Sequence, residues 1–89
     1  MMEDKVTKRS RDTIISKILD ICSNGASKTR IVYQANLNFK TVTPYMDLLI
    51  KNELIAVGKG RTVEYRTTER GEALRENFKQ INSQLIELS

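Results

Sequence analysis

The side chains of this chain that can do chemistry are mainly cationic and hydroxylic, and they gather in three short segments. These segments are residues 27–30, residues 38–43 and the glycine-rich stretch 58–61. Lysine and arginine bind phosphate oxygens, whereas threonine and asparagine reach phosphates or the edges of bases. This set of residue types favours recognition of a polyanion over catalysis.

Most enzyme chemistry is excluded by what the sequence lacks. The chain has no histidine and one cysteine, so it offers no plausible zinc site and no histidine-dependent acid–base or nucleophilic catalysis. Cys22 falls on an apolar stripe and is expected to be a small buried hydrophobe. The tyrosines and carboxylates form no nucleophile–base set. We therefore expect neither an enzyme nor a cofactor nor a metal.

Length and charge limit the remaining classes. The 89 residues fit one small domain with a marginal core, and a lone cysteine cannot make an internal disulfide, which favours association with a partner chain. The net charge is +4, with +5 on residues 1–68 and −1 on residues 69–89. No apolar run is long enough to span a membrane. We expect a cytoplasmic protein with no membrane partner.

The first half of the chain predicts three helices. Residues 1–9 lack apolar periodicity and are expected to form a flexible basic arm. Ser10 then caps a helix over residues 11–23, and Ser27 caps a second helix over 28–35. A tight turn at 36–38, with Leu37 at its corner, leads into a third helix over 39–52 that is capped by Asn38.

Pro44 falls inside this third helix, where it removes one backbone hydrogen bond. Two interpretations are open. The first turn of the helix is loosened, or the helix begins at residues 43–44 with proline in its first position.

The second half predicts a hairpin and a last helix. Two β-like runs, 54–57 and 62–67, flank the glycine-rich turn, and Thr68 caps a helix over 69–88. A short helix, a tight turn, a second helix and a hairpin describe a winged helix. The expected fold is mainly α (α+β), with a winged helix-turn-helix domain over 10–68 and a coiled-coil dimerisation helix over 69–89.

This arrangement places the cationic segments where a winged helix meets double-stranded DNA. The third helix enters the major groove and the hairpin tip reaches the neighbouring backbone or minor groove. We predict groove contacts from Lys40, Thr41 and Thr43, and hairpin contacts from Lys59 and Arg61. The flanking phosphates would be bound by Lys28, Arg30 and Asn38.

Apolar residues of the last helix repeat at intervals of four and three, which is the spacing of a coiled-coil seam. Most other positions of this helix are charged or polar. We expect a homodimer through it, with an alternative in which the stripe packs on its own domain. The seam comprises Leu74, Phe78, Ile81, Leu85 and Leu88.

Three segments, residues 27–38, 45–55 and 65–71, resemble the small archaeal winged helix-turn-helix DNA-binding proteins, a group that includes the dimeric "10a" type of archaeal chromatin protein. The resemblance covers about residues 11–89. It implies a homodimer joined by an antiparallel coiled coil, with DNA bound by the third helix and the wing. It leaves open whether the protein regulates transcription or organises the nucleoid. The alternative function is a winged-helix module that binds proteins and not DNA.

Overall fold

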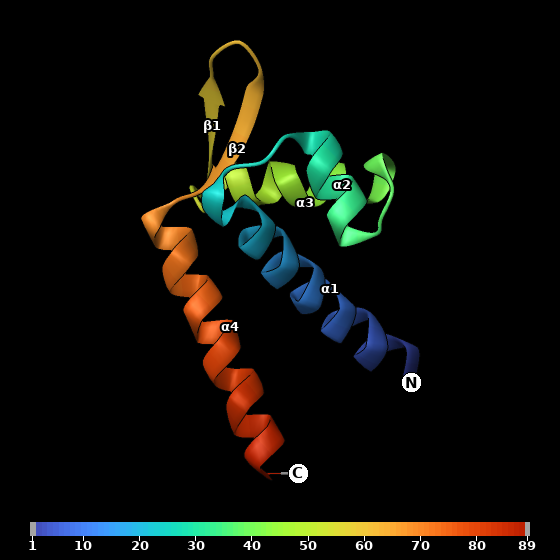
Figure 1. Ribbon diagram of the computed structural model, residues 1–89. Helices are drawn as coiled ribbons and strands as arrows, with labels where there is room; N and C mark the ends of the chain where they lie inside the picture. Colours follow the sequence, from blue (N-terminus) through green and yellow to red (C-terminus); the bar gives the residue numbers. More distant parts are fainter. Residues whose placement is uncertain (1, 89) are drawn as a thin grey trace.

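The computed structural model describes the backbone of residues 2–88 and the side chains of residues 11–80. Four helices and one antiparallel hairpin follow the predicted order (Figure 1). The winged-helix fold class is therefore confirmed. The elements are α1 (Met2–Ile21), a 3-10 turn η1 (Cys22–Asn24), α2 (Lys28–Ala35), α3 (Phe39–Lys51), β1 (Ile55–Lys59), β2 (Val63–Thr67) and α4 (Glu69–Leu88).

The core lies where α1, α2 and α3 meet the base of the hairpin. Its members recur at helical spacing, as amphipathic helices require. Each of them is less than 3% exposed, and the half-buried Leu74 and Phe78 of α4 pack against them. The core residues are Ile18, Leu19, Cys22, Ala26, Ile31, Val42, Met46, Leu49 and Ile55.

Both predicted caps of the helix-turn-helix are present. The Ser27 hydroxyl accepts a hydrogen bond from the Arg30 amide, and the Asn38 side-chain oxygen accepts one from the Thr41 amide at 2.7 Å. These bonds satisfy helix-start donors that would otherwise lack partners. Asn36 ends α2 in the left-handed region, at a φ of 59°. The tight turn before α3 is therefore fixed from both sides.

The base of the hairpin is tied to the segment before α2. Ala26 and Tyr65 exchange two backbone hydrogen bonds of 2.9 and 2.8 Å, so residue 26 extends the two-stranded sheet by one bridge. At the end of β2, the buried Thr67 hydroxyl donates to the Leu19 carbonyl at 2.6 Å. These contacts fix the direction in which the hairpin leaves the body.

Thr68 and Gly71 fix the start of α4. The Thr68 hydroxyl donates to the Glu53 carbonyl and accepts from the Gly71 amide, so it caps the helix as predicted. A Cβ at position 71 would overlap the carbonyl oxygen of Leu54. Glycine is needed here because the helix runs against the α3–β1 connection.

A polar network, which we call the α4 anchor, joins α4 to α1 and η1. Arg75 donates to Asp20 at 2.6 Å and to Glu72 at 2.7 Å, and the Ser23 hydroxyl donates to Glu72 at 2.8 Å. The Ser23 hydrogen bond, with help from Arg75, lowers the pKa of the Glu72 carboxyl. The anchor holds the first turns of α4 against the body.

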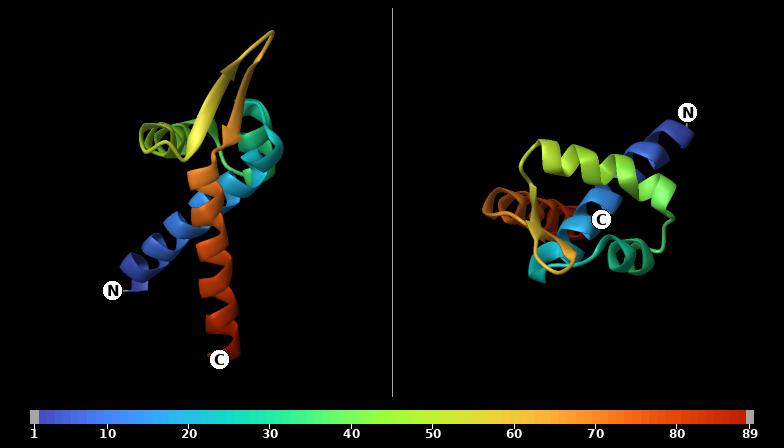
Figure 2. Two further views of the ribbon diagram at one scale, coloured as in Figure 1. Left: turned by 90° about the vertical axis from the view of Figure 1, so that its left-hand side faces the viewer. Right: turned by 90° about the horizontal axis from the view of Figure 1, so that it is seen from above.

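The two ends of the molecule differ in shape. The hairpin projects at one end, beside α2 and α3, whereas the N-terminal part of α1 and the C-terminal part of α4 extend from the other end and diverge (Figures 1 and 2). The molecule measures 47 × 26 × 21 Å along its principal axes.

Two boundary predictions need correction. α1 begins at Met2, so residues 2–9 are helical and not an arm, and Ser10 is not the cap. Weak apolar periodicity does not prevent a helix in a segment without glycine or proline. α3 begins at Phe39 with Pro44 inside it, which excludes a start at residues 43–44.

Three apolar side chains are more exposed than their pattern predicts. Phe39 is 50% exposed because it lies at the first position of α3, on the flank of the helix. Val57 and Val63, which share one face of the hairpin with the buried Ile55, are 38% and 50% exposed. Their strands extend beyond the body of the domain (Figure 1). Side chains therefore still alternate between the two faces of the hairpin, but in this part neither face packs on the core.

Candidate nucleic-acid interface

One line of exposed side chains runs along α3 opposite its buried face. At 3.6 residues per turn, positions 40, 44, 47 and 51 lie on the side away from the buried Val42, Met46 and Leu49. We call Lys40, Pro44, Asp47 and Lys51 the outer stripe. It presents a cation at each end and small side chains in the middle.

The predicted threonines lie on the two flanks of this stripe. Thr41 and Thr43 are both half-buried. The Thr43 hydroxyl donates to the Phe39 carbonyl of its own helix at 2.7 Å. Pro44 has no amide hydrogen, so the Lys40 carbonyl has no backbone donor from residue 44. Of the three predicted groove residues, Lys40 is the one that is exposed and belongs to the outer stripe.

The cations of α2 and the cap of α3 surround the helix-turn-helix. Arg30 is exposed and Lys28 is half-buried in the first turn of α2. Asn38 is exposed, but its side-chain oxygen is used by the Thr41 amide. Its amide nitrogen therefore supplies any contact outside the helix.

Lys59 and Arg61 lie at the hairpin tip, as predicted, and both side chains are exposed. The register pairs Lys59 with Val63 and Val57 with Tyr65. One face of the hairpin therefore carries Lys59 beside the two exposed valines. The Glu64–Arg66 ion pair lies on the other face, at 3.4 Å.

These elements lie at the same end of the molecule. Seen from above, α2 and α3 flank the hairpin, with α1 and α4 receding behind (Figure 2). Arg66 of β2 pairs with Glu64, but among the side chains of residues 11–80 the six other cations of α2, α3 and the hairpin take part in no ion pair. These cations are Lys28, Arg30, Lys40, Lys51, Lys59 and Arg61.

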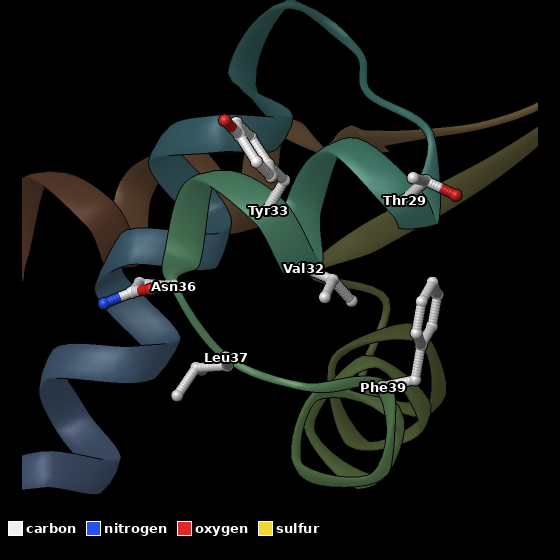
Figure 3. A pocket seen from close by; sticks show the side chains of 6 residues that line it. All are labelled: Thr29, Val32, Tyr33, Asn36, Leu37 and Phe39. Atoms are coloured by element: carbon white, nitrogen blue, oxygen red, sulfur yellow. The ribbon is translucent and has the colours of Figure 1, made fainter.

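A shallow pocket of about 610 Å³ lies between α2 and the start of α3. Tyr33, which is 85% exposed, and Phe39 extend from different parts of its rim, with Val32 between them (Figure 3). Thr29, Asn36 and Leu37 complete its lining. The pocket is mostly apolar. It lies beside the six cations named above, and none of them lines it.

The predicted dimer seam is only partly within the described side chains. Leu74 and Phe78 are half-buried and pack against the core of their own domain. For these two seam residues, this is what the alternative to a dimer seam predicts, namely packing of the apolar residues of α4 on their own domain. The side chains of Ile81, Leu85 and Leu88 lie outside the described residues. α4 itself continues as a helix to Leu88.

Other chemistry is sparse in the described part of the chain. Burial raises the pKa of the Cys22 thiol to about 12, so the thiol stays protonated at neutral pH. Among the side chains of residues 11–80, no three histidine, cysteine, aspartate or glutamate residues lie close enough to hold a metal ion. No described helix is both long and apolar enough to cross a membrane.

Asp47 and Lys51 are not among the groove contacts that were predicted from the sequence. The signal was present, because positions 40, 44, 47 and 51 share one helical face. The structure adds that the helix continues through Pro44 to Lys51.

The chain belongs to the winged helix-turn-helix family, which it matches over residues 8–85. This match agrees with the fold and with the arrangement of α2, α3 and the hairpin. The resemblance drawn from residues 27–38, 45–55 and 65–71 is confirmed.

Individual relatives are archaeal. The chain is 40% identical to the uncharacterized protein MJ0287 of Methanocaldococcus jannaschii over 68 residues, which are 75% of this chain and 67% of that protein. It is 37% identical to the uncharacterized protein MJ0290 of the same organism over 75 residues, which are 83% of this chain and 34% of that protein. This chain therefore spans about a third of MJ0290.

A solved structure is also similar. Sso10a-2, a DNA-binding protein from Sulfolobus solfataricus, superposes with a TM-score of 0.71 at 28% identity, covering 86% of this chain and 85% of that one.

Proposed function

We propose that this protein binds double-stranded DNA through the end of the molecule formed by α2, α3 and the hairpin. The observation that carries the proposal is the set of six cations at this end that form no ion pair among the described residues. Unpaired cations contribute little to folding but release counterions when they meet phosphates. The similarity to Sso10a-2, described as a DNA-binding protein, supports the same function.

The proposed roles follow from position. The outer stripe of α3 faces the major groove, where Lys40 reaches base edges or a phosphate and Thr41 and Thr43 line the flanks. Lys59 and Arg61 contact the backbone or the minor groove beside it. Lys28, Arg30 and the Asn38 amide hold flanking phosphates.

The test is a fluorescence-anisotropy titration of a labelled duplex of random sequence at about 50 and 200 mM salt. Micromolar binding that weakens steeply with salt is the expected result. Absence of binding at the lower salt concentration would contradict the proposal. In the cell, the same activity fits a cytoplasmic transcription regulator or nucleoid protein.

We also propose that the protein is a homodimer through α4. The 4-3-4-3 spacing of apolar residues supports this, and so does the way the distal half of α4 leaves the body (Figure 1). Leu74 and Phe78 are largely used by their own domain, so the contact would depend on Ile81, Leu85 and Leu88. Multi-angle light scattering is expected to give twice the 10.2 kDa chain mass, and Leu85→Arg to halve it. A monomer at about 100 µM would contradict the dimer.

The second candidate function is protein binding without DNA. The pocket beside Tyr33 and Phe39 favours it, because exposed aromatic residues around a depression are typical of protein interfaces. The same titration distinguishes the two functions. A DNA-binding protein loses affinity with salt, whereas a protein-binding module shows no duplex binding even at low salt.

A further inference from the structure

We propose that Asp47 selects cytosine in the DNA site by accepting a hydrogen bond from the cytosine N4 amine in the major groove. This inference rests on the proposed function and adds a base preference to it. The observation behind it is a carboxylate in the middle of the outer stripe that has no ion-pair partner among the described side chains, on the surface that would face a polyanion.

The geometry lets a short side chain reach the floor of the groove. Asp47 is exposed, and Pro44, one turn before it, is compact and carries no polar group. Lys40 and Lys51 lie at the two ends of the stripe, about 16 Å apart at 1.5 Å rise per residue. This separation exceeds the groove width of about 12 Å, so both lysines can extend to phosphates while the middle of the helix approaches the bases.

Because Asp47 is negatively charged, its hydrogen-bond partner on DNA must be a base and not a phosphate. A carboxylate only accepts hydrogen bonds, and phosphates offer it no donor. Among the side chains of residues 11–80, no cation lies within ion-pair distance of Asp47, although Lys51 is one turn away. On DNA binding the carboxylate would lose water without an intramolecular replacement, which is costly unless a donor takes its place.

Two major-groove donors exist, the N4 amine of cytosine and the N6 amine of adenine. Adenine places the N7 acceptor beside its amine, and this acceptor repels the second carboxylate oxygen. Cytosine carries no acceptor on its own ring beside the amine in the major groove. The carboxylate at position 47 therefore favours cytosine, whereas an asparagine would match the donor–acceptor pair of adenine.

The experiment is selection of binding sites from a randomised duplex library, followed by sequencing and by affinity measurements on the selected sites. It uses the wild-type chain, Asp47→Asn and Asp47→Ala. The matched controls are Asp12→Asn and Asp12→Ala, because Asp12 is also an exposed aspartate but lies on α1.

The wild type is expected to prefer cytosine about tenfold at one position of the site. Asp47→Asn should shift that position to adenine. Asp47→Ala should remove the preference there while tightening binding to unselected DNA. The Asp12 variants should reproduce the wild-type site.

Two results would overturn this inference and leave the proposed DNA binding intact. In one, wild type and Asp47→Asn select the same base at every position. In the other, both Asp47 variants tighten binding equally to all sequences, which would make Asp47 a simple source of repulsion. If the wild type binds no duplex at low salt, the proposed function fails and this inference fails with it.

Discussion

Arg75 and Lys40 are both cations on helices, but the two ends of the molecule use them differently. Arg75 is 20% exposed and is held between Asp20 and Glu72. Lys40 is exposed, and no acid within the described residues pairs with it. The first contributes to the position of α4 and the second is available to a ligand.

This difference extends to each whole region. Around the start of α4, hydroxyls, carboxylates and a guanidinium satisfy one another and join segments about fifty residues apart in the sequence. At the hairpin tip and along the outer stripe, charged side chains have no ion-pair partner among the side chains of residues 11–80. The α4 end is organised for stability, and we propose that the hairpin end is organised for binding. Each prediction below should affect one property and leave the other unchanged.

The largest expected effect is on stability, at the contact between α4 and the α3–β1 connection. Gly71→Ala should lower the free energy of unfolding by about 3 kcal/mol, because the new methyl group overlaps the Leu54 carbonyl. Gly60→Ala is the control, since a Cβ there meets no atom within 4 Å. Chemical denaturation checks both variants, and equal stabilities would show that α4 does not approach the body as described.

The hairpin tip should show the opposite behaviour. Lys59→Glu combined with Arg61→Glu is expected to weaken binding of every duplex at low salt by at least about tenfold. Because both side chains are exposed, the free energy of unfolding should stay within about 0.5 kcal/mol of wild type. Anisotropy titration and thermal denaturation measure the two quantities. Unchanged affinity would remove the hairpin from the interface.

Within the α4 anchor, Arg75→Ala should lower the free energy of unfolding by about 1 kcal/mol, a modest loss because Asp20 stays solvent-accessible. Arg70→Ala is the control. Its 3.8 Å pair with Glu53 joins side chains that are 70% and 82% exposed, so no measurable loss is expected. If the two variants were equally stable, the anchor would contribute no more than an ordinary surface pair.

The smallest expected effect depends on pH. The folded chain lowers the pKa of Glu72 below its ordinary value of 4.5, so this carboxylate stabilises the fold above that pH. The contribution is lost as pH falls through the lowered pKa. The stability difference between wild type and Glu72→Gln should therefore be present at pH 7 and disappear in acid.

Local signals in the sequence predicted most of the fold. The caps at Ser27, Asn38 and Thr68 are set by hydrogen bonds within a few residues, and their helices begin where the sequence predicts. The start of α1 was missed because periodicity reports which helical face is buried and not whether a charged segment is helical. The exposure of Val57 and Val63 depends on how far the hairpin extends past the body, which alternation does not encode.

The candidate site was predicted in part. The cations at positions 28, 30, 40, 59 and 61 were identified from their types and from the order of elements, and all belong to segments at one end of the molecule. The engagement of Thr43 with the Phe39 carbonyl and the absence of a described partner for Asp47 required coordinates. The α4 anchor was also missed, because it joins residues far apart in the sequence.

We propose that the cations of the hairpin end, and not cations in general, bind DNA. The most direct test compares the salt dependence of duplex affinity for three proteins. They are the wild type, a double variant at the hairpin tip (Lys59→Ala with Arg61→Ala) and a control double variant (Lys17→Ala with Lys79→Ala). The control removes two exposed lysines, one on α1 and one on α4. We predict that the log–log slope falls by about 1.8 for the hairpin pair and stays at the wild-type value for the control pair. Equal slopes for the two double variants would contradict the division of the molecule into a stabilising end and a binding end.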